Sequence, residues 1–531
     1  MKSVMSHNFS QVPRANIPRS SFDRSCGHKT TFNAGKLIPI YCDEALPGDT
    51  FNARLHLFGR LATPIHPFMD NLFIDTHFFA VPNRLLWDNW EKFNGAQDNP
   101  GDSTDYLVPQ LTAPTGGFAN GSLSDHMGIP TGVEGLSLNA LHHRAYALIW
   151  NEWFRDQNLQ DSIDIPKGDG PDDPANYPIM NRGKRHDYFT SALPWPQKGP
   201  SVEIPLGQQA PVSGIGFAAA GAAPPVTEYF NTDGSTFMAA QTGVNAGQQN
   251  VGVNSAGGAG TTANVYADLS EATAATINQL RQSFQIQKLY ERDARGGTRY
   301  IELLKSHFGV TSPDARLQRP EYLGGSSAPI SLSQVAQTQS SDTVTPQANL
   351  AAYGTTAMRG HGFNKSFVEH CVIIGLASVR ADLTYQQGLN RMFSRQTRWD
   401  FYWPALAHIG EQAVLNKEIY AQGPAVVDPN GDPVDDNVFG YQERFAEYRY
   451  KPSLITGQFR SNFAQTLDTW HLSQDFESLP ALNDSFIQEN PPVDRVIAVT
   501  DYPHLIVDTH MQLRCARPMP IYSVPGLIDH F

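Results

Sequence analysis

The sequence predicts an all-β fold, in which an antiparallel barrel carries large insertions between its strands. Glycine (43 residues) and proline (38) are both frequent among the 531 residues, which favours turns and long loops over long helices. Amphipathic strand patterns occur near both ends of the chain, at 49–61 and 505–515. Helical patterns and two long irregular stretches lie between them. Such an arrangement is typical of a jelly roll with most of its mass in insertions.

Three segments near the two ends of the chain show the alternating pattern of β-strands. In residues 49–61 apolar and polar side chains alternate, so one face is expected to be buried and the other wet. Residues 72–81 are more apolar and end at Pro82, which indicates a deeper strand. The segment 505–515 repeats the alternation of the first. Because a jelly roll brings its first and last strands together, we predict that 49–61 pairs antiparallel with 503–516.

The hydrophobic period changes to that of helices in three places. Residues 137–157 carry apolar side chains at helical spacing, which predicts an amphipathic helix. Ser270 is a suitable N-cap for a second helix that ends at Gly296 and Gly297. A short third helix is expected at 300–308, followed by a glycine.

One more strand and two irregular segments complete the pattern. Residues 367–385 are apolar on both faces, as in a central strand covered on both sides. Residues 205–268 hold 11 glycines and 13 alanines in 64 residues, without lysine or arginine, and therefore form an insertion. Residues 324–356 are rich in serine, glutamine and threonine. Both segments are far longer than a typical loop, and we expect long structureless loops with a functional role or disorder.

The charges are few and unevenly distributed. Charged residues make up only 17% of the chain, which indicates that another protein covers much of the surface, as in an assembly subunit. The net charge of −13 argues against a protein that binds nucleic acid over its whole surface. Residues 1–36, however, hold six basic residues against Asp23 alone. We expect a basic extended arm with little contact to its own barrel, and a folded domain over 37–531.

Motifs of enzyme and metal chemistry are absent from the sequence. There is no GxxxxGK[ST], GxSxG or HExxH motif, and the four cysteines form no CxxC pair and require no disulfide. The sequence shows no signal peptide and no membrane span, which predicts a cytosolic product. We predict neither an enzyme nor a cofactor.

One metal site has the required residue types. Asp75 and His77 lie two apart on a strand, so they point to one face and could bind a metal together with His56 or His66. A hydrogen-bonded core pair of histidine and aspartate is the more common arrangement and is the interpretation that we prefer.

The segment 440–463 interleaves aromatic rings with basic side chains, among them Arg444, Arg449 and Lys451. Such a pattern can stack bases and hold phosphates on single-stranded DNA. It equally describes a subunit interface, where tyrosine and arginine are enriched, and this is the interpretation that we favour.

Long blocks of sequence resemble one family. They are SSFDRSCGHKTTFNAGKLIPIYCDEALPGDTF (20–51), SALPWPQKGP (191–200), RDARGGTRY (292–300), SPDARLQRPEYLGG (312–325), SVRADLTYQQGLNRMFSR (378–395), YWPALAHIGEQAVLNKEIY (402–420), GYQERFAEYRYKPS (440–453) and CARPMPIYSVPGLIDHF (515–531). Together they resemble the major capsid proteins of gokushoviruses, which are bacteriophages of the Microviridae with single-stranded DNA.

The resemblance implies a fold and an architecture. We expect an eight-stranded antiparallel viral jelly roll with large inter-strand insertions that contain several helices. Sixty copies would form a T=1 icosahedral shell around a circular genome. The family's variable insertion, which corresponds to 205–268 here, would form a protrusion at the threefold axes that attaches to a bacterial surface receptor. Three copies meeting there would bury the large side chains of the insertion, which are Phe217, Tyr229, Phe230, Phe237 and Met238.

The resemblance also implies partners and a location. The expected partners are a small basic DNA-packaging protein, a DNA pilot protein and an internal scaffolding protein. An acidic shell cannot neutralise a polyanionic genome, so the basic component is also expected on physical grounds. The chain would assemble in the bacterial cytoplasm and reside in the virion. Candidate residues facing nucleic acid are Arg14, Arg19, Arg24, Lys29, Arg444, Arg449 and Lys451.

Two other functions are weighed against a capsid protein. A glycan-binding jelly roll of an attachment protein shares the fold class and would form trimers without a closed shell. A β-rich hydrolase would act as a monomer on a substrate, but no set of residues fills the roles that catalysis needs.

Overall fold

A computed structural model describes residues 18–202, 277–339 and 347–522, together with the backbone of short strands between 212 and 267. The chain divides into two compact units. The larger unit combines residues 1–196 with 296–531, and the smaller unit comprises residues 197–295. In the described part of the chain, none of the helices has the length and hydropathy of a membrane span.

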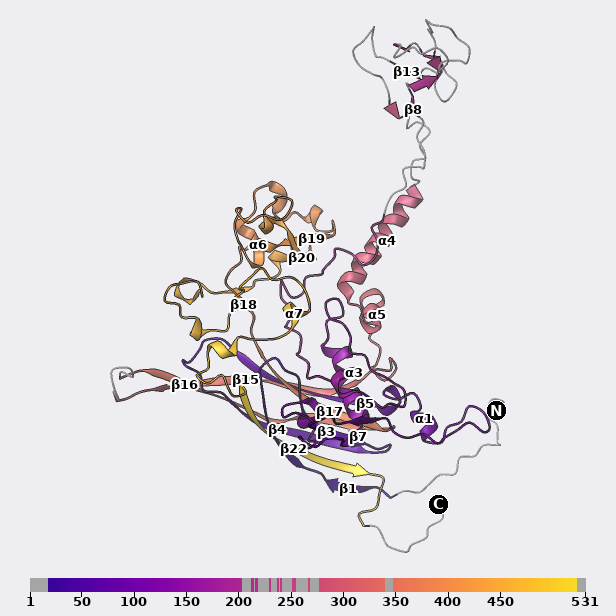
Figure 1. Cartoon of the computed structure of the whole chain (residues 1–531), viewed down its shortest axis with the longest axis vertical. Helices are drawn as coiled ribbons and strands as arrows, with labels where there is room; N and C mark the ends of the chain where they lie inside the picture. The colour runs from indigo at the N-terminus through magenta and orange to yellow at the C-terminus, as the bar shows by residue number, and fades with distance from the viewer. Residues whose placement is uncertain are drawn as a thin grey trace. The chain divides into compact units, whose positions relative to one another are not determined.

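The larger unit is built on one antiparallel sheet (Figure 1). In pairing order its strands are β1 (Ser20–Asp23), β22 (Leu505–Arg517), β4 (Thr50–Leu61), β16 (Leu350–Ser366), β15 (Glu321–Ala336), β5 (Leu72–Pro82), β17 (Cys371–Ala381) and β3 (Ile38–Ala45), and β2 (Cys26–Phe32) also pairs with β22. The two edges approach each other, because His28 Nδ1 on β2 lies 3.1 Å from the backbone oxygen of Ile40 on β3. The sheet therefore curls into a barrel-like shape.

The predicted pairing of the first and last strands is confirmed. β4 and β22 are antiparallel neighbours, in a register that runs from Leu61 opposite Leu505 to Thr50 opposite Ala516. Alternate residues of both strands point into the barrel and form its core, as the sequence alternation predicts. The buried members are Phe51, Ala53, Leu55, Leu57, Leu61, Leu505, Val507, Met511, Leu513 and Cys515.

Strands β5 and β17 lie deeper, as predicted for 72–81 and 367–385. All residues of β17 are buried. Side chains on one face of β5, such as Phe78, join the barrel core, whereas Phe79 on the other face joins a second core. Helix α3 (Leu141–Ile149) packs in that second core, followed by a π-helical turn over Trp150–Phe154. The amphipathic helix predicted in 137–157 is thus confirmed, although Ser137–Asn139 forms a short strand.

Two further helices agree with the sequence pattern. Helix α4 spans Ile277–Gly296, and the cap expected at Ser270 lies outside the described residues. Helix α5 (Tyr300–Phe308) ends at Gly309, whose φ of 70° is left-handed. Glycine adopts this conformation without the strain that a Cβ would add.

The expectation of a structureless loop over 324–356 is wrong. Most of the described part of this segment belongs to β15 and β16, which pair with each other and extend the main sheet. Small inward residues such as Ala352 and Gly354 stand between large ones such as Ile330 and Phe363, and a Cβ at Gly354 would meet Leu61 at 2.8 Å. Serine, alanine, glycine and threonine give little hydrophobic alternation, so backbone pairing forms strands that the pattern does not indicate.

The expectation that the whole arm 1–36 avoids its own barrel is also wrong. β1 and β2 both pair with β22. Phe32 and Ala34 are buried in the barrel core. The strands are polar because they lie at the edge of the sheet and expose most of their side chains. Residues 1–17, including Arg14, lie outside the described residues.

In the smaller unit, the backbone of the insertion forms short antiparallel strands instead of a structureless loop. Their pairing order is β11 (Thr236–Phe237), β10 (Tyr229–Phe230), β9 (Ile215–Phe217), β13 (Val251–Asn254) and β12 (Ala239–Ala240). Phe230 pairs with Phe217, and Tyr229 pairs with Phe237. Met238, the fifth residue predicted for the protrusion, lies outside the described residues.

Candidate interaction surfaces

The segment 440–463 begins in a two-stranded sheet of β19 (Glu411–Leu415) and β20 (Val438–Glu443). Behind β20 the chain turns sharply at Phe445, which has a φ of 62° and a buried ring. The backbone N–H of Phe445 donates a 3.1 Å hydrogen bond to Gln412 on β19. The turn is therefore fixed by the sheet and carries the following residues, Ala446–Tyr448, as a 3₁₀ turn.

Arg395 ties a second segment to this turn. Its guanidinium lies 4.2 Å from the ring centroid of Tyr448 and 5.5 Å from that of Phe401. It also pairs with Glu447 at 3.2 Å, and this carboxylate is almost fully buried. Tyr402 packs edge-on against Phe445 with ring centroids 5.3 Å apart. Cation–π contacts and a shielded ion pair thus hold the aromatic rings in a defined arrangement.

The rings beside Arg395 face solvent in a single chain. Arg398 lies 4.5 Å from the ring centroid of Trp403 and 5.4 Å from that of Trp399. Trp399 is 58% exposed and Trp403 is 40% exposed. We call the exposed large side chains of the two segments the aromatic surface: Met392, Phe393, Trp399, Phe401, Tyr402, Trp403 and Tyr448. Such a concentration of exposed rings marks a surface that another molecule covers.

Only one of the seven members of this surface lies in a segment for which the sequence predicted a contact. The segment 440–463 contributes Tyr448, but residues 392–403 supply most of the rings and were not assigned a role. Their sequence, MFSRQTRWDFYW, interleaves arginine and aromatic residues in the same way as 440–463. That composition was the signal that could have identified them.

The predicted nucleic-acid-facing residues lie in two separate places. Arg19 and Lys29 lie in or beside β1 and β2, whereas Arg444, Arg449 and Lys451 follow β20, which Figure 1 shows well away from β1. The two groups therefore do not form one patch.

Ion pairs occupy several of these cations. Arg24 makes a two-point ion pair with Asp43, with N–O distances of 2.7 and 2.9 Å. Arg449 pairs with Glu443. Arg444 lies over the ring of Phe445 at 4.8 Å and donates a hydrogen bond to the backbone oxygen of Trp399. Lys451 is exposed.

Comparison with known proteins decides the family. The family described as "Capsid protein (F protein)" matches residues 10–527. The chain belongs to this capsid protein family. Capsid protein VP1 of Bdellovibrio phage phiMH2K is 53% identical over 533 residues, covering 99% of this chain and 98% of the relative.

Two further relatives support the same assignment. Capsid protein VP1 of Chlamydia phage 1 is 46% identical and covers 99% of this chain and 98% of its own length. Capsid protein VP1 of Spiroplasma virus 4 is 39% identical, with coverage of 98% and 97%. The resemblance to gokushovirus capsid proteins of the Microviridae is confirmed, and such a capsid protein is a component of the virion.

In this capsid protein the residues considered for a metal site are separate: Asp75 belongs to an ion-pair network, His56 packs against His510, and His66 stacks on Trp470. Asp75 accepts hydrogen bonds from Arg182 at 2.6 Å and from Arg380 at 2.8 Å. Burial and the nearby Arg182 lower the pKa of His77 to about 4, so its ring stays neutral. Within the described residues there is no group of three or more histidine, cysteine, aspartate or glutamate side chains that could hold a metal.

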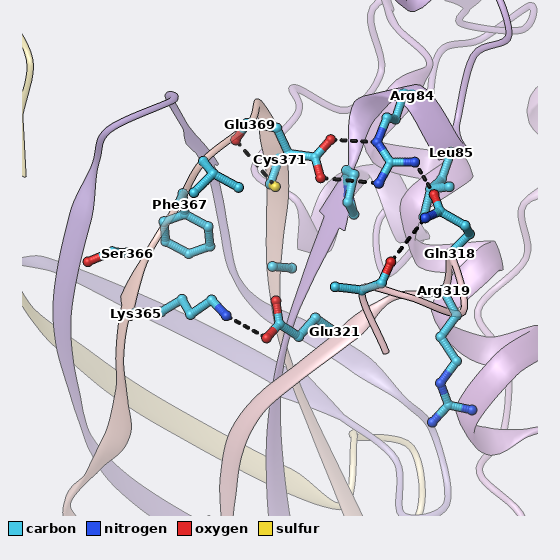
Figure 2. A pocket seen from close by; sticks show the side chains of 14 residues that line it. Arg84, Leu85, Gln318, Arg319, Glu321, Lys365, Ser366, Phe367, Glu369 and Cys371 are labelled. Carbon is cyan, nitrogen blue, oxygen red and sulfur yellow. Dashed lines mark hydrogen bonds and ion pairs between the residues drawn. The ribbon is translucent and has the colours of Figure 1, made fainter. Parts of the chain in front are cut away.

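A small pocket of about 160 Å³ opens at one end of the barrel, between β5, β16 and β17 (Figure 2). Its charged groups are matched in pairs. Arg84 binds both carboxylate oxygens of Glu369, and Lys365 donates to Glu321 at 2.5 Å. Burial raises the pKa of the Cys371 thiol at the pocket wall to about 12, which keeps it unreactive. Because each charge has its partner, the pocket offers no unbalanced group to a ligand.

Proposed function

We propose that the chain is the structural subunit of a closed T=1 shell of sixty copies around a circular single-stranded DNA genome, and that it has no enzymatic role. The observation that supports this most directly is the aromatic surface. Its rings are held in place by Arg395 and Arg398 but remain open to solvent. A subunit that must bind further copies of itself requires such a surface.

The aromatic surface is suited to association and not to folding. Trp399, Tyr402 and Trp403 are at least 40% exposed, so they contribute little to the core of their own chain. Tryptophan, tyrosine and arginine dominate the binding energy of protein interfaces. Cation–π contacts fix the rings before association, which reduces the entropy lost when a neighbouring subunit binds.

The barrel supports the assembly role with a stable framework. We propose that its curled antiparallel sheet is an eight-stranded viral jelly roll extended by the short strands at its edge. The insertion 205–268 would form the protrusion at the threefold axes and bind a receptor on the bacterial surface. Its lack of lysine and arginine leaves few groups that would tie it to the acidic framework.

The net charge implies further components. Each subunit carries a formal charge of −13, so a shell of many copies cannot neutralise an enclosed genome without cations. A small basic DNA-packaging protein would supply them, and a DNA pilot protein and an internal scaffolding protein complete the proposed set. Assembly would take place in the bacterial cytoplasm.

The test is the replacement Trp403→Ser, with Trp403→Phe as the matched control. Trp403→Ser should reduce the yield of closed particles by tenfold or more, measured by sedimentation and electron microscopy, because it removes a central ring of the interface. Trp403→Phe retains a ring and should assemble. Circular dichroism and thermal unfolding should be unchanged in both variants. Normal particles from the serine variant would exclude this surface from assembly, and trimers without shells in the unmodified protein would favour an attachment protein.

A further inference from the structure

The solvent face of the main sheet differs in character from the rest of this acidic protein. On β4 the residues that alternate with the core side chains are exposed or half-buried, and they include Arg54, His56, Phe58 and Arg60. Since neighbouring strands place paired residues on the same face, the registry with β22, β2 and β16 identifies the rest of the surface. We call it the basic sheet face, and its cationic members are Lys29, Arg54, Arg60, Arg359 and Arg514.

The registry brings the cations into adjacent rows. Arg359 on β16 pairs with His56 on β4, which pairs in turn with His510 on β22. The rings of His56 and His510 have centroids 6.4 Å apart. Neighbouring strands are ~4.8 Å apart, and Arg54 and Arg60 are separated by roughly 20 Å along one strand. The positive groups therefore lie on adjacent strands of one face of the sheet.

Few acidic groups oppose these cations. Asp508 and Asp23 are the carboxylates that the registry places among these cations, and Lys29 pairs with Asp508 at 3.5 Å. Both partners of that pair are more than half exposed, so their attraction is strongly screened. Among the described residues, no carboxylate forms an ion pair with Arg54, Arg60 or Arg359. Arg24, by contrast, has its charge matched by Asp43.

Apolar side chains lie among the cations. Phe58 is 51% exposed and stands between Asp508 and Ala357 in the registry. Ile506 and Tyr353 are exposed on the same face. An open aromatic ring beside guanidinium groups suits the stacking of unpaired bases, whereas a surface that only has to stay soluble needs no such ring.

We propose that the basic sheet face binds the backbone of single-stranded DNA without sequence preference, with Phe58 stacking on bases. This inference rests on the proposed function, because it requires a genome beside the subunit. Arginine donates up to five hydrogen bonds in a planar fork that matches phosphate. The basic sheet face would repel a basic packaging protein. The sheet face and the packaging protein would therefore bind different parts of the genome. Arg19, which donates a 2.9 Å hydrogen bond to Thr50, lies at the border of this face, and Lys29 lies within it.

The test compares two triple variants of the full-length chain. The face variant combines Arg54→Gln, Arg60→Gln and Arg359→Gln, and the control combines Lys167→Gln, Arg185→Gln and Arg316→Gln, which are exposed and lie elsewhere. Both remove three positive charges. Binding to a fluorescent 20-nucleotide oligo-dT is measured against salt concentration. The slope of log K against log salt should fall by about 2 in the face variant and remain unchanged in the control, since each lost phosphate contact removes about 0.7.

Two further measurements separate the competing outcomes. Phe58→Ala should weaken oligo-dT binding about tenfold, while Phe58→Tyr should retain it. Equal loss in both triple variants, or none in the face variant, would overturn the proposal. If the face variant retains binding to oligo-dT but loses binding to polyglutamate, the basic sheet face binds an acidic protein segment instead. Particle formation is scored separately by sedimentation, so that a face variant that forms intact particles and binds oligo-dT like the unmodified chain refutes this inference and leaves the proposed function standing.

Discussion

The guanidinium of Arg144 on α3 and the carboxylate of Asp172 form a two-point ion pair with no solvent exposure on either side chain. The N–O distances are 2.6 and 2.8 Å. Arg144 also donates to the backbone oxygens of Leu86 and Gly168, and Tyr177 donates to Asp172 at 2.6 Å. This pair therefore connects the helix to three segments of chain that have little regular structure of their own.

Replacement of Arg144 by methionine should lower the free energy of unfolding by about 3–5 kcal/mol, because it leaves the carboxylate of Asp172 buried without its cation. The partly exposed pair of Lys417 and Asp436 provides the control. Lys417→Met should cost less than about 1 kcal/mol. Urea unfolding followed by tryptophan fluorescence measures both. Similar costs for the two variants would contradict the importance assigned to the buried pair.

Acid should destabilise the protein through His143. Burial lowers the pKa of this histidine to about 4, whereas the unfolded chain has the ordinary value of about 6.5. Between these values the unfolded state binds more protons, so stability is fully present above pH 6.5 and falls as the pH approaches 4, by on the order of 3 kcal/mol in total.

The variant His143→Gln should show a shallower decline of stability between pH 6.5 and 4. His142→Gln is the neighbouring control and should retain the decline of the unmodified chain, since His142 faces Glu44 at the protein surface. Unfolding free energies at four or five pH values decide the matter. An unchanged pH dependence in His143→Gln would mean that other groups cause the acid sensitivity.

The orientation of β22 can be tested with two residues of one strand. Leu513 is fully buried in the barrel, whereas Ile506 is 63% exposed. Leu513→Ala should cost about 2–5 kcal/mol and Ile506→Ala no more than about 0.5 kcal/mol. Thermal or urea unfolding gives both values. A reversed order would show that the strand presents its other face to the core.

Deletion of the insertion 205–268 should separate assembly from attachment. Replacement by a short glycine–serine linker should cost little folding stability, because the ends of the segment are joined by a loop in either case. Particles should form but fail to adsorb to host cells. Adsorption and infectivity are measured, with particle yield as the control. Normal adsorption by such particles would end the receptor role, and loss of all particles would give the insertion a structural role.

The sequence predicted those elements in which large side chains carry the pattern. β4 and β22 alternate large apolar residues such as Phe51 and Leu513 with polar ones, so their burial and their pairing followed from periodicity. Helix α3 was identified by the change in period. β15 and β16 were missed because serine, glycine and other small residues interrupt the alternation of their large ones. β2 was missed because an edge strand can be polar throughout.

The candidate surfaces were only partly predictable for a different reason. Composition indicated that the segment around Tyr448 contacts a partner, but only the fold brings Arg395 and Trp403 to the same surface. Similarly, the charge of Arg54 or Arg359 is visible in the sequence, whereas their alignment across two strands depends on a register that includes a bulge after Arg359. Local sequence patterns identify individual helices and strands, whereas the surfaces depend on pairing between residues that are distant in the sequence.

The position of β22 between β2 and β4 has a consequence for biosynthesis. Arg517 at the end of this strand contacts Asp49, which precedes it by 468 residues. A ribosome makes roughly 5–20 residues per second, so the early strands wait for tens of seconds with an unpaired edge. During that interval the basic sheet face is incomplete and the barrel cannot close. The barrel can therefore close only after the 468 residues that separate Asp49 from Arg517 have been translated.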